Sequence, residues 1–184
     1  MPFSAIVTER LVLRDLEASD APRIFVYRSH PEVSRFQSWG TESGDEISSY
    51  IGGIATMEPG APGLWYQLGI ELRSSRQLIG DCGFRVMHHE PRQVEFGIAL
   101  DLKFQSKGYA AEALRALLDY LLVKLDKHRV FGSVDPRNVR SIRLMQRVGM
   151  RKEAHFVQSL WFQGEWVDDM IFAMLASDWK SGKL

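Results

Sequence analysis

Three runs of alternating apolar and polar residues follow one another in the middle of the chain. They cover residues 64–72, 78–86 and 94–100, and short polar segments separate them. A side-chain period of two places the apolar residues of each run on one face of an extended strand. Strands joined by such short turns favour an antiparallel meander.

A pattern with the helical period comes next. Its apolar residues recur at spacings of three and four and form one stripe: Ala110, Ala113, Leu114, Leu117, Leu118, Leu121, Leu122 and Leu125. Beyond this helix the pattern predicts a strand over 129–135, a helix over 138–148 ended by Gly149, and strands over 151–161 and 165–175 around the turn 162–164. The strands before and after the long helix should be parallel neighbours joined by a right-handed crossover.

The first third of the chain predicts one strand and two helices. The strand covers residues 6–16, and Ser19-Asp20 offers a cap for a helix over 21–29, which Pro31 interrupts. Residues 41–44 form a turn or cap before a second helix over 45–57. The order β-α-α-β-β-β-α-β-α-β-β indicates a mixed α/β fold, and a length of 184 residues suits one domain over 1–184.

Composition narrows the classes of partner. Lys plus Arg and Asp plus Glu both total 23, so the net charge is zero and no nucleic-acid partner is expected. No apolar run of about 18 residues predicts a membrane span, and no Cys/His spacing predicts a metal site. The single cysteine, Cys82, excludes an intrachain disulfide and fits the cytoplasm. Its apolar surroundings favour a buried thiol over a nucleophile.

The sharpest local signal is the segment Gln105-Ser106-Lys107-Gly108-Tyr109-Ala110, between the third meander strand and the long helix. Unpaired N–H groups and the positive dipole end make a helix N-terminus a phosphate site. Gly108 would let the backbone approach a ligand without a Cβ in the way. On spacing alone, a plain strand-to-helix turn explains the segment equally well.

The motif Q-x-x-G-x-A at this place resembles the acyl-CoA pyrophosphate loop of the GNAT acetyltransferases. The stretches TERLVLRDLEASDAPRIF, HPEVSRFQSW, VEFGIALDLKFQSKGYAAEAL and NVRSIRLMQRVGMRKEAHFVQSLWFQGEWVDDMIFAMLASDW resemble the RimJ/RimL-like branch. The resemblance therefore covers nearly the whole chain, in order.

This resemblance implies a splayed central strand pair with the pantetheine arm of acetyl-CoA in the wedge. Ile98, Ala99 and Leu100 would contact that arm through backbone groups, and residues 105–110 would hold the pyrophosphate. Asn138 would touch the arm, and Ser141 would lie near the thiol sulfur. Asn138 also suits a plain helix cap, Ser141 a solvated helix position, and Glu112 an organiser of the loop.

Amine acetylation needs a base for the amine proton and a donor for the thiolate. Glu95 is the candidate base because it shares a strand face with the small residues Gly97 and Ala99; a salt-bridged strand glutamate is the alternative. Many members of the family carry a tyrosine as general acid where this chain has Met145, whose thioether donates no proton. The acid is then Ser141, or the thiolate is released to water.

The leading hypothesis is an N-acetyltransferase that moves an acetyl group from acetyl-CoA to a primary amine by direct attack in a ternary complex. The acceptor is a small molecule or peptide: a protein N-terminus, an amino acid, a polyamine or a drug. Three tryptophans either line the acceptor side of the site or belong to the core or an interface: Trp39, Trp161 and Trp166. A homodimer is possible. The rival is an acyl-CoA-binding regulatory module that has lost catalysis; a nucleic-acid-directed acetyltransferase is a weaker third.

Overall fold

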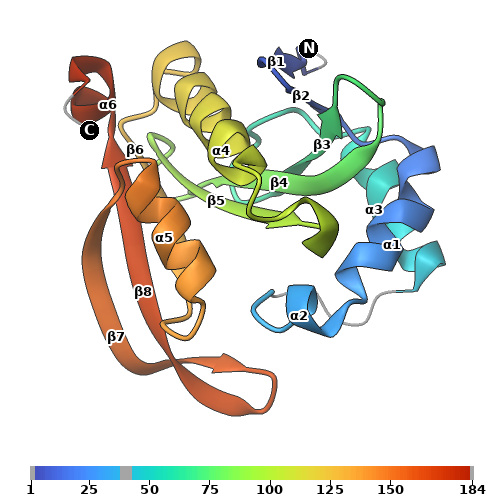
Figure 1. The fold of residues 1–184 in the computed structure, drawn as a ribbon. Coiled ribbons are helices and arrows are strands. Elements are labelled where there is room, and N and C mark those ends of the chain that lie inside the picture. Colours follow the sequence, from blue (N-terminus) through green and yellow to red (C-terminus); the bar gives the residue numbers. More distant parts are fainter. Residues whose placement is uncertain (1–2, 38–42, 183–184) are drawn as a thin grey trace.

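One mixed sheet dominates the computed structural model, which describes residues 3–37 and 43–182 (Figure 1). Its strands lie in the order β1-β2-β3-β4-β5-β6-β8-β7. Their bounds are β1 Ile6–Val7, β2 Leu11–Asp15, β3 Trp65–Leu72, β4 Leu78–Val86, β5 Gln93–Leu100, β6 Arg129–Val134, β7 Arg151–Phe162 and β8 Glu165–Leu175. The predicted mixed α/β fold and its antiparallel meander, β3-β4-β5, are confirmed.

Helices cover both faces of this sheet. Their bounds are α1 Ala21–Arg28, α2 Pro31–Ser34, α3 Gly44–Ile54, α4 Tyr109–Asp119, α5 Val139–Arg147 and α6 Ala176–Ser181. A π-helical turn over Tyr120–Lys124 extends α4. Figure 1 shows α1, α2 and α3 gathered at one end of the sheet and α5 beside the β7–β8 hairpin at the other.

The core consists of two apolar clusters. The larger joins the apolar stripe of α4, including the fully buried Leu114 and Leu118, to Val94 and Phe96 of β5. The smaller joins Ile24 of α1 and residues of α3 to the sheet, where Ala99 belongs to it. Since neighbouring residues of a strand point to opposite faces, α4 lies on one face of β5 and α1 on the other.

The parallel pair at the centre of the sheet is splayed, as predicted. β5 and β6 pair only through Gln93↔Arg129, Val94↔Val130 and Glu95↔Phe131. Both strands then continue without pairing to each other, β5 as far as Leu100 and β6 as far as Val134. The backbone edges that face each other beyond Glu95 and Phe131 therefore lack a strand partner.

Several boundaries differ from the predictions. The single strand expected over 6–16 is the hairpin β1–β2, because hydrogen bonds between Thr8 and Leu11 close a turn. Thr8 N–H donates to Leu11 O, and Leu11 N–H donates to Thr8 Oγ1. Asp20 precedes α1 without capping it through its side chain; the carboxylate binds Arg14 instead. The short helices α2 and α6 were not expected, and the second helix ends at Ile54.

The closing hairpin carries its two tryptophans on the surface. Trp161 and Trp166 pack edge to face with ring centroids 5.3 Å apart, and they are 59% and 57% exposed. This excludes the core alternative for both residues. Trp39, Thr41 and Glu42, which the sequence placed on the acceptor side or in a turn, lie outside the described residues.

Candidate active site

A set of unsatisfied backbone donors lies where β5 leads into α4. From Ser106 to Ala111, no N–H group donates a hydrogen bond to a protein atom of residues 3–37 or 43–182; the first bond of the helix is from Glu112 N to Gly108 O, at 3.1 Å. Among the described residues, no side chain caps this helix. Unpaired donors at a helix N-terminus, where the dipole is positive, favour an anion.

The backbone of this loop has the shape that concentrates those donors. Ser106 and Gly108 are both left-handed, with φ of 61° and 83°, whereas Gln105 is extended. Alternation of left-handed and other conformations turns successive N–H groups toward a common point and forms an anion-binding concavity. The loop thus fits the pyrophosphate group that the sequence assigned to it.

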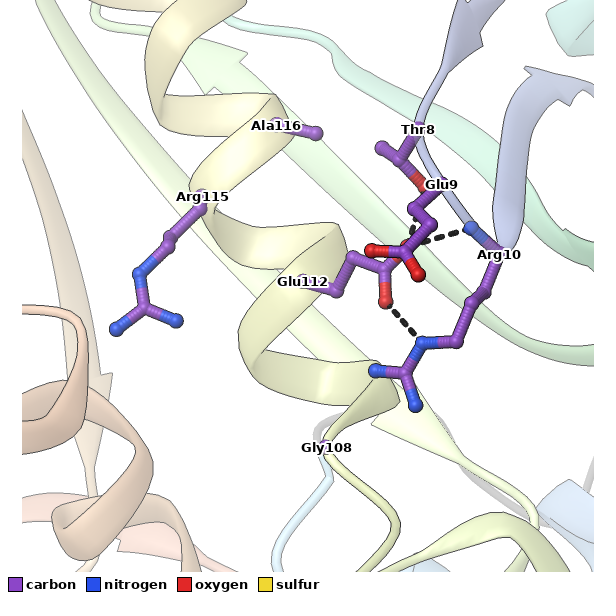
Figure 2. Close-up of a pocket in the computed structure, with 7 residues that line it drawn as sticks. All are labelled: Thr8, Glu9, Arg10, Gly108, Glu112, Arg115 and Ala116. Carbon is purple, nitrogen blue, oxygen red and sulfur yellow. Dashed lines mark hydrogen bonds and ion pairs between the residues drawn. The ribbon is translucent and has the colours of Figure 1, made fainter.

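Glu112 anchors the loop to the first hairpin of the sheet (Figure 2). Its Oε1 accepts from Thr8 Oγ1 at 2.6 Å and from Arg10 N at 2.9 Å, and its Oε2 accepts from Arg10 Nε at 2.6 Å. Burial raises the pKa of Glu112, but these hydrogen bonds outweigh it, so the pKa lies below its ordinary 4.5. The structure therefore supports the loop-organising role for Glu112.

Arg10 continues this anchor to the loop itself. Its Nη1 donates to Lys107 O at 3.1 Å, and its guanidinium lies 4.6 Å from the Tyr109 ring centroid. A guanidinium held this close adds positive charge beside the free N–H groups.

A shallow groove of about 480 Å³ opens beside the same loop. Its lining comes from the β1–β2 turn and the first turns of α4: Thr8, Glu9, Arg10, Gly108, Glu112, Arg115 and Ala116. Figure 2 shows Arg115 pointing away from Arg10, and its Nη2 donates to Arg147 O at 2.7 Å. No residue of β5 or β6 lines this groove, so it is distinct from the wedge between those strands.

The wedge is bordered by backbone groups of β5. Asp101 N donates to Ile79 O, on the β4 side; because backbone direction alternates along a strand, Ile98 and Leu100 direct their N–H and C=O groups toward the wedge. Leu100 O accepts from Gln105 Nε2 at 3.0 Å. Ala99 directs its backbone toward β4 and its buried side chain toward α1.

The opposite wall of the wedge is β6 with the start of α5. Asn138 caps α5, since its Oδ1 accepts from Ser141 N at 3.1 Å. The Nδ2 of Asn138 and the Oγ of Ser141 bind no other described residue. Met145 is buried against Gly132 of β6, so the position of the family's tyrosine belongs to the core.

Glu95 occupies the last paired position before the strands part. Its Oε2 forms an ion pair with Arg85 Nη2, and Arg85 Cζ lies 5.2 Å from the Trp65 ring centroid. The carboxylate side chain is 17% exposed, and it lies on the face of β5 opposite the buried Val94 and Phe96. This geometry fits Glu95 both as a catalytic base and as a salt-bridged strand residue, because the ion pair uses only one carboxylate oxygen.

The described residues offer neither a reactive thiol nor a metal site. Cys82 is fully buried, and burial raises the pKa of its thiol well above the usual value. Within residues 3–37 and 43–182, no three His, Cys, Asp or Glu side chains gather as a metal site. No described helix combines the length and apolar character of a membrane span.

Three residues that build the site were not predicted as site residues from the sequence. Arg10 and Thr8 reach Glu112 across more than 100 residues, and Arg140 of α5 donates to Gln105 Oε1 at 3.0 Å. No periodicity links positions so far apart. The available signal was the resemblance, whose quoted stretches contain Thr8, Arg10 and Arg140.

A splayed parallel pair, with an anion-binding helix N-terminus at the end of its first strand, defines an acyltransferase of the GNAT fold. Residues 10–151 match the family described as "Acetyltransferase (GNAT) domain", and the chain belongs to that family.

Individual relatives agree with this assignment. An uncharacterized N-acetyltransferase of Bacillus subtilis, YnaD, is 29% identical over 95% of this chain and 98% of its own. The [ribosomal protein uS5]-alanine N-acetyltransferase of Escherichia coli is 28% identical over 100% and 96%.

Solved structures show the same architecture. A GNAT-family acetyltransferase from Bacillus anthracis has a TM-score of 0.84 at 27% identity, with 95% of this chain and 99% of that chain covered. The spermidine N-acetyltransferase of Vibrio cholerae, in complex with CoA and spermine, has a TM-score of 0.81 at 22% identity, over 94% and 99%. The latter likeness concerns the fold alone.

Proposed function

We propose that this acyltransferase moves an acetyl group from acetyl-CoA to a primary amine by direct attack within a ternary complex. The observation that carries the proposal is the run of free N–H groups from Ser106 to Ala111 at the end of β5. A thioester of CoA supplies an activated acetyl group, and its pyrophosphate is the anion that such a loop fits.

The cofactor arm would follow the wedge. Residues 106–110 hold the pyrophosphate through backbone N–H groups, while Lys107 and Arg10 add positive charge. Gln105, which the sequence included in this set, donates its N–H to Leu102 O instead. Ile98 and Leu100 offer backbone groups to the pantetheine amides, whereas Ala99 directs its backbone toward β4 and its buried side chain toward α1. Asn138 Nδ2 and Ser141 Oγ, at the cap and in the first turn of α5, face the far end of the arm.

Glu95 would take the amine proton. It lies on the face of β5 that α4 does not cover, and its Oε1 accepts no hydrogen bond from another described residue. An amine attacks only when neutral, so a carboxylate oxygen at the mouth of the wedge, acting directly or through water, promotes the reaction. Ser141 is the candidate donor to the departing thiolate.

The acceptor classes follow from the relatives as well as the site. One relative acts on the alanine of a ribosomal protein, and a structural neighbour binds spermine. A peptide N-terminus, an amino acid, a polyamine and a drug amine are therefore the acceptors to compare.

The decisive variant is Glu95→Gln, which removes the proton acceptor and nearly preserves shape. We expect kcat to fall by about 100-fold or more, with recovery at high pH where more amine is neutral, and the Kd of acetyl-CoA to stay unchanged. Glu90→Gln is the matched control, because Glu90 is also paired with an arginine, Arg92, but on the β4–β5 turn. Full activity with an unchanged pH profile would remove Glu95 from the mechanism.

The rival reading, a non-catalytic acyl-CoA-binding module, gives a different result. Such a protein and both of its variants bind acetyl-CoA with the same affinity, and none of them acetylates a peptide N-terminus, an amino acid, a polyamine or a drug amine. Loss of both binding and rate in Glu95→Gln would instead assign a structural role to the Arg85–Glu95 pair.

A further inference from the structure

A row of four side chains crosses the sheet where the wedge opens. Trp65 of β3 is directly opposite Arg85 of β4, Arg85 is opposite Glu95 of β5, and Glu95 is opposite Phe131 of β6. Residues opposite each other in a sheet project from the same face. The aromatic, cationic, anionic and aromatic groups therefore lie side by side on the face that bears the candidate base.

Two contacts hold Arg85 in this row, and they leave N–H donors of its guanidinium available. Nη2 pairs with Glu95 and the Trp65 ring flanks the guanidinium, while Nη1 donates to no other described residue. The Arg85 side chain is still 35% exposed. Thus a free guanidinium donor lies next to the free Oε1 of Glu95.

The next positions along the strands leave space beside this pair. Gly97 follows Glu95 on the same face, and a Cβ built there would only approach the Trp65 ring to 3.9 Å, an ordinary contact. Gly83, its partner on β4, is covered by the Gln67 side chain. A small group above Gly97 would meet the Trp65 ring on one side and the Arg85–Glu95 pair on the other.

An adjacent donor and acceptor select one type of amine. In an α-aminoacyl group, the amine donates a hydrogen bond and the carbonyl oxygen, three bonds from the nitrogen, accepts one. A polyamine offers cationic donors alone, which cannot pair with a guanidinium and are repelled by it. Arg85 also neutralises the charge of Glu95 that would otherwise attract a polycation.

We propose that Arg85 is the specificity-determining residue of the acceptor site. It binds the carbonyl oxygen of an α-aminoacyl acceptor while Glu95 receives the amine. This inference rests on the proposed function, because it requires that the acceptor approach the β5 face at the wedge. It goes further by selecting aminoacyl amines, such as peptide N-termini, over polyamines.

The test compares two amines that differ at one group. Alaninamide carries the carbonyl, and 2-amino-3-methylbutane replaces its carboxamide by an isopropyl group of similar size. The Kd of each amine is measured by calorimetry with CoA bound, and kcat/KM is measured with acetyl-CoA; spermidine is included in both series. Arg85→Met keeps an apolar stem against Trp65 and removes the donors, and Arg92→Met on the distant turn is the matched control.

We expect wild type and Arg92→Met to prefer alaninamide over the isostere, and Arg85→Met to lose this preference. A hydrogen bond to a charged group corresponds to a factor of about 10–150 in affinity, so the ratio of the two Kd values should fall by at least tenfold. The basicity of the amines cancels in that comparison of variant with wild type. Arg85→Lys keeps a cation but has a single donor nitrogen in place of the guanidinium fork, and it should show a smaller selective loss if Arg85→Met folds poorly.

The two hypotheses fail in different ways. An unchanged Kd ratio in Arg85→Met, or wild-type protein that binds spermidine more tightly than alaninamide, overturns the role of Arg85. A selective ratio of Kd values without any acetyl transfer supports Arg85 and rejects the proposed function.

Discussion

Replacing Gly108 by valine tests the phosphate loop most directly. Gly108 has φ of 83° and ψ of −5° at the N-terminus of α4, a region that L-residues and especially β-branched residues avoid. A Cβ at this position would also come within 3.3 Å of Arg10 Nη2. The variant must therefore either hold a strained backbone or rotate the loop and misdirect its N–H groups.

The expected magnitudes separate folding from binding. A left-handed backbone costs an L-residue about 1–2 kcal/mol, which lowers Tm by roughly 2–8 °C in a domain of this length. Losing one hydrogen bond to a phosphate charge costs a further 1.5–3 kcal/mol of binding, or roughly 10–150-fold in the Kd of acetyl-CoA. Differential scanning fluorimetry and calorimetric titration measure the two effects.

Gly164→Val provides the matched control for Gly108→Val. Gly164 has a similar φ of 89° in the β7–β8 turn, and a Cβ there would meet nothing within 4 Å. It should show a comparable loss of Tm with wild-type affinity for acetyl-CoA. If Gly108→Val also keeps the wild-type Kd, the pyrophosphate binds elsewhere and the assignment of the loop is wrong.

Three further predictions concern the cofactor, the loop anchor and the cap. Acetyl-CoA at 100 times its Kd should stabilise the protein by about 2.7 kcal/mol, a rise in Tm of roughly 5–11 °C; no shift at millimolar ligand would contradict the cofactor. The pKa of Glu112 lies below its ordinary 4.5 in the folded state, so its contribution is complete above about pH 4.5 and is lost as the pH falls below that value. Glu112→Gln should therefore lower the free energy of unfolding at pH 7, and that free energy should fall less steeply in acid than it does in the wild type. Equal dependence on pH below about 4.5 in both proteins would refute this. Asn138→Ala should cost about 1 kcal/mol through loss of the helix cap, whereas Asn138→Asp keeps the cap; if only the alanine variant binds acetyl-CoA less tightly, the side-chain amide is not a ligand.

Much of the fold could be predicted because its elements have local signatures. The α4 stripe, from Ala113 to Leu122, is a helical repeat in the sequence and is buried in the structure. The meander strands follow the two-residue period. The left-handed φ of Gly108 and Gly149 explains why a glycine precedes α4 and another follows α5. The break in the first strand was missed because a single turn at Thr8 interrupts an otherwise continuous apolar pattern.

The order of the last strands shows where such signatures end. β8, not β7, pairs with β6, and its Phe172, Ala173 and Met174 are buried, while no residue of β7 is. The more apolar end of β8 agrees with this placement, but both β7 and β8 have the periodicity of a strand, so the pattern alone does not order them. Which of them lies inside depends on packing against α4 and α5.

By itself the sequence determined the periods of the strands and helices and the place of a glycine at the start of α4, because backbone geometry imposes these patterns on residues close together in the chain. It also indicated Glu95 as the candidate base, from the small residues that share its strand face. The tertiary structure decided that Glu112 is held by Thr8 and Arg10, and that Glu95 shares its face with Arg85 and Trp65. Those contacts join positions on different strands and helices, and only the register and packing of the folded chain bring their charges within hydrogen-bond distance.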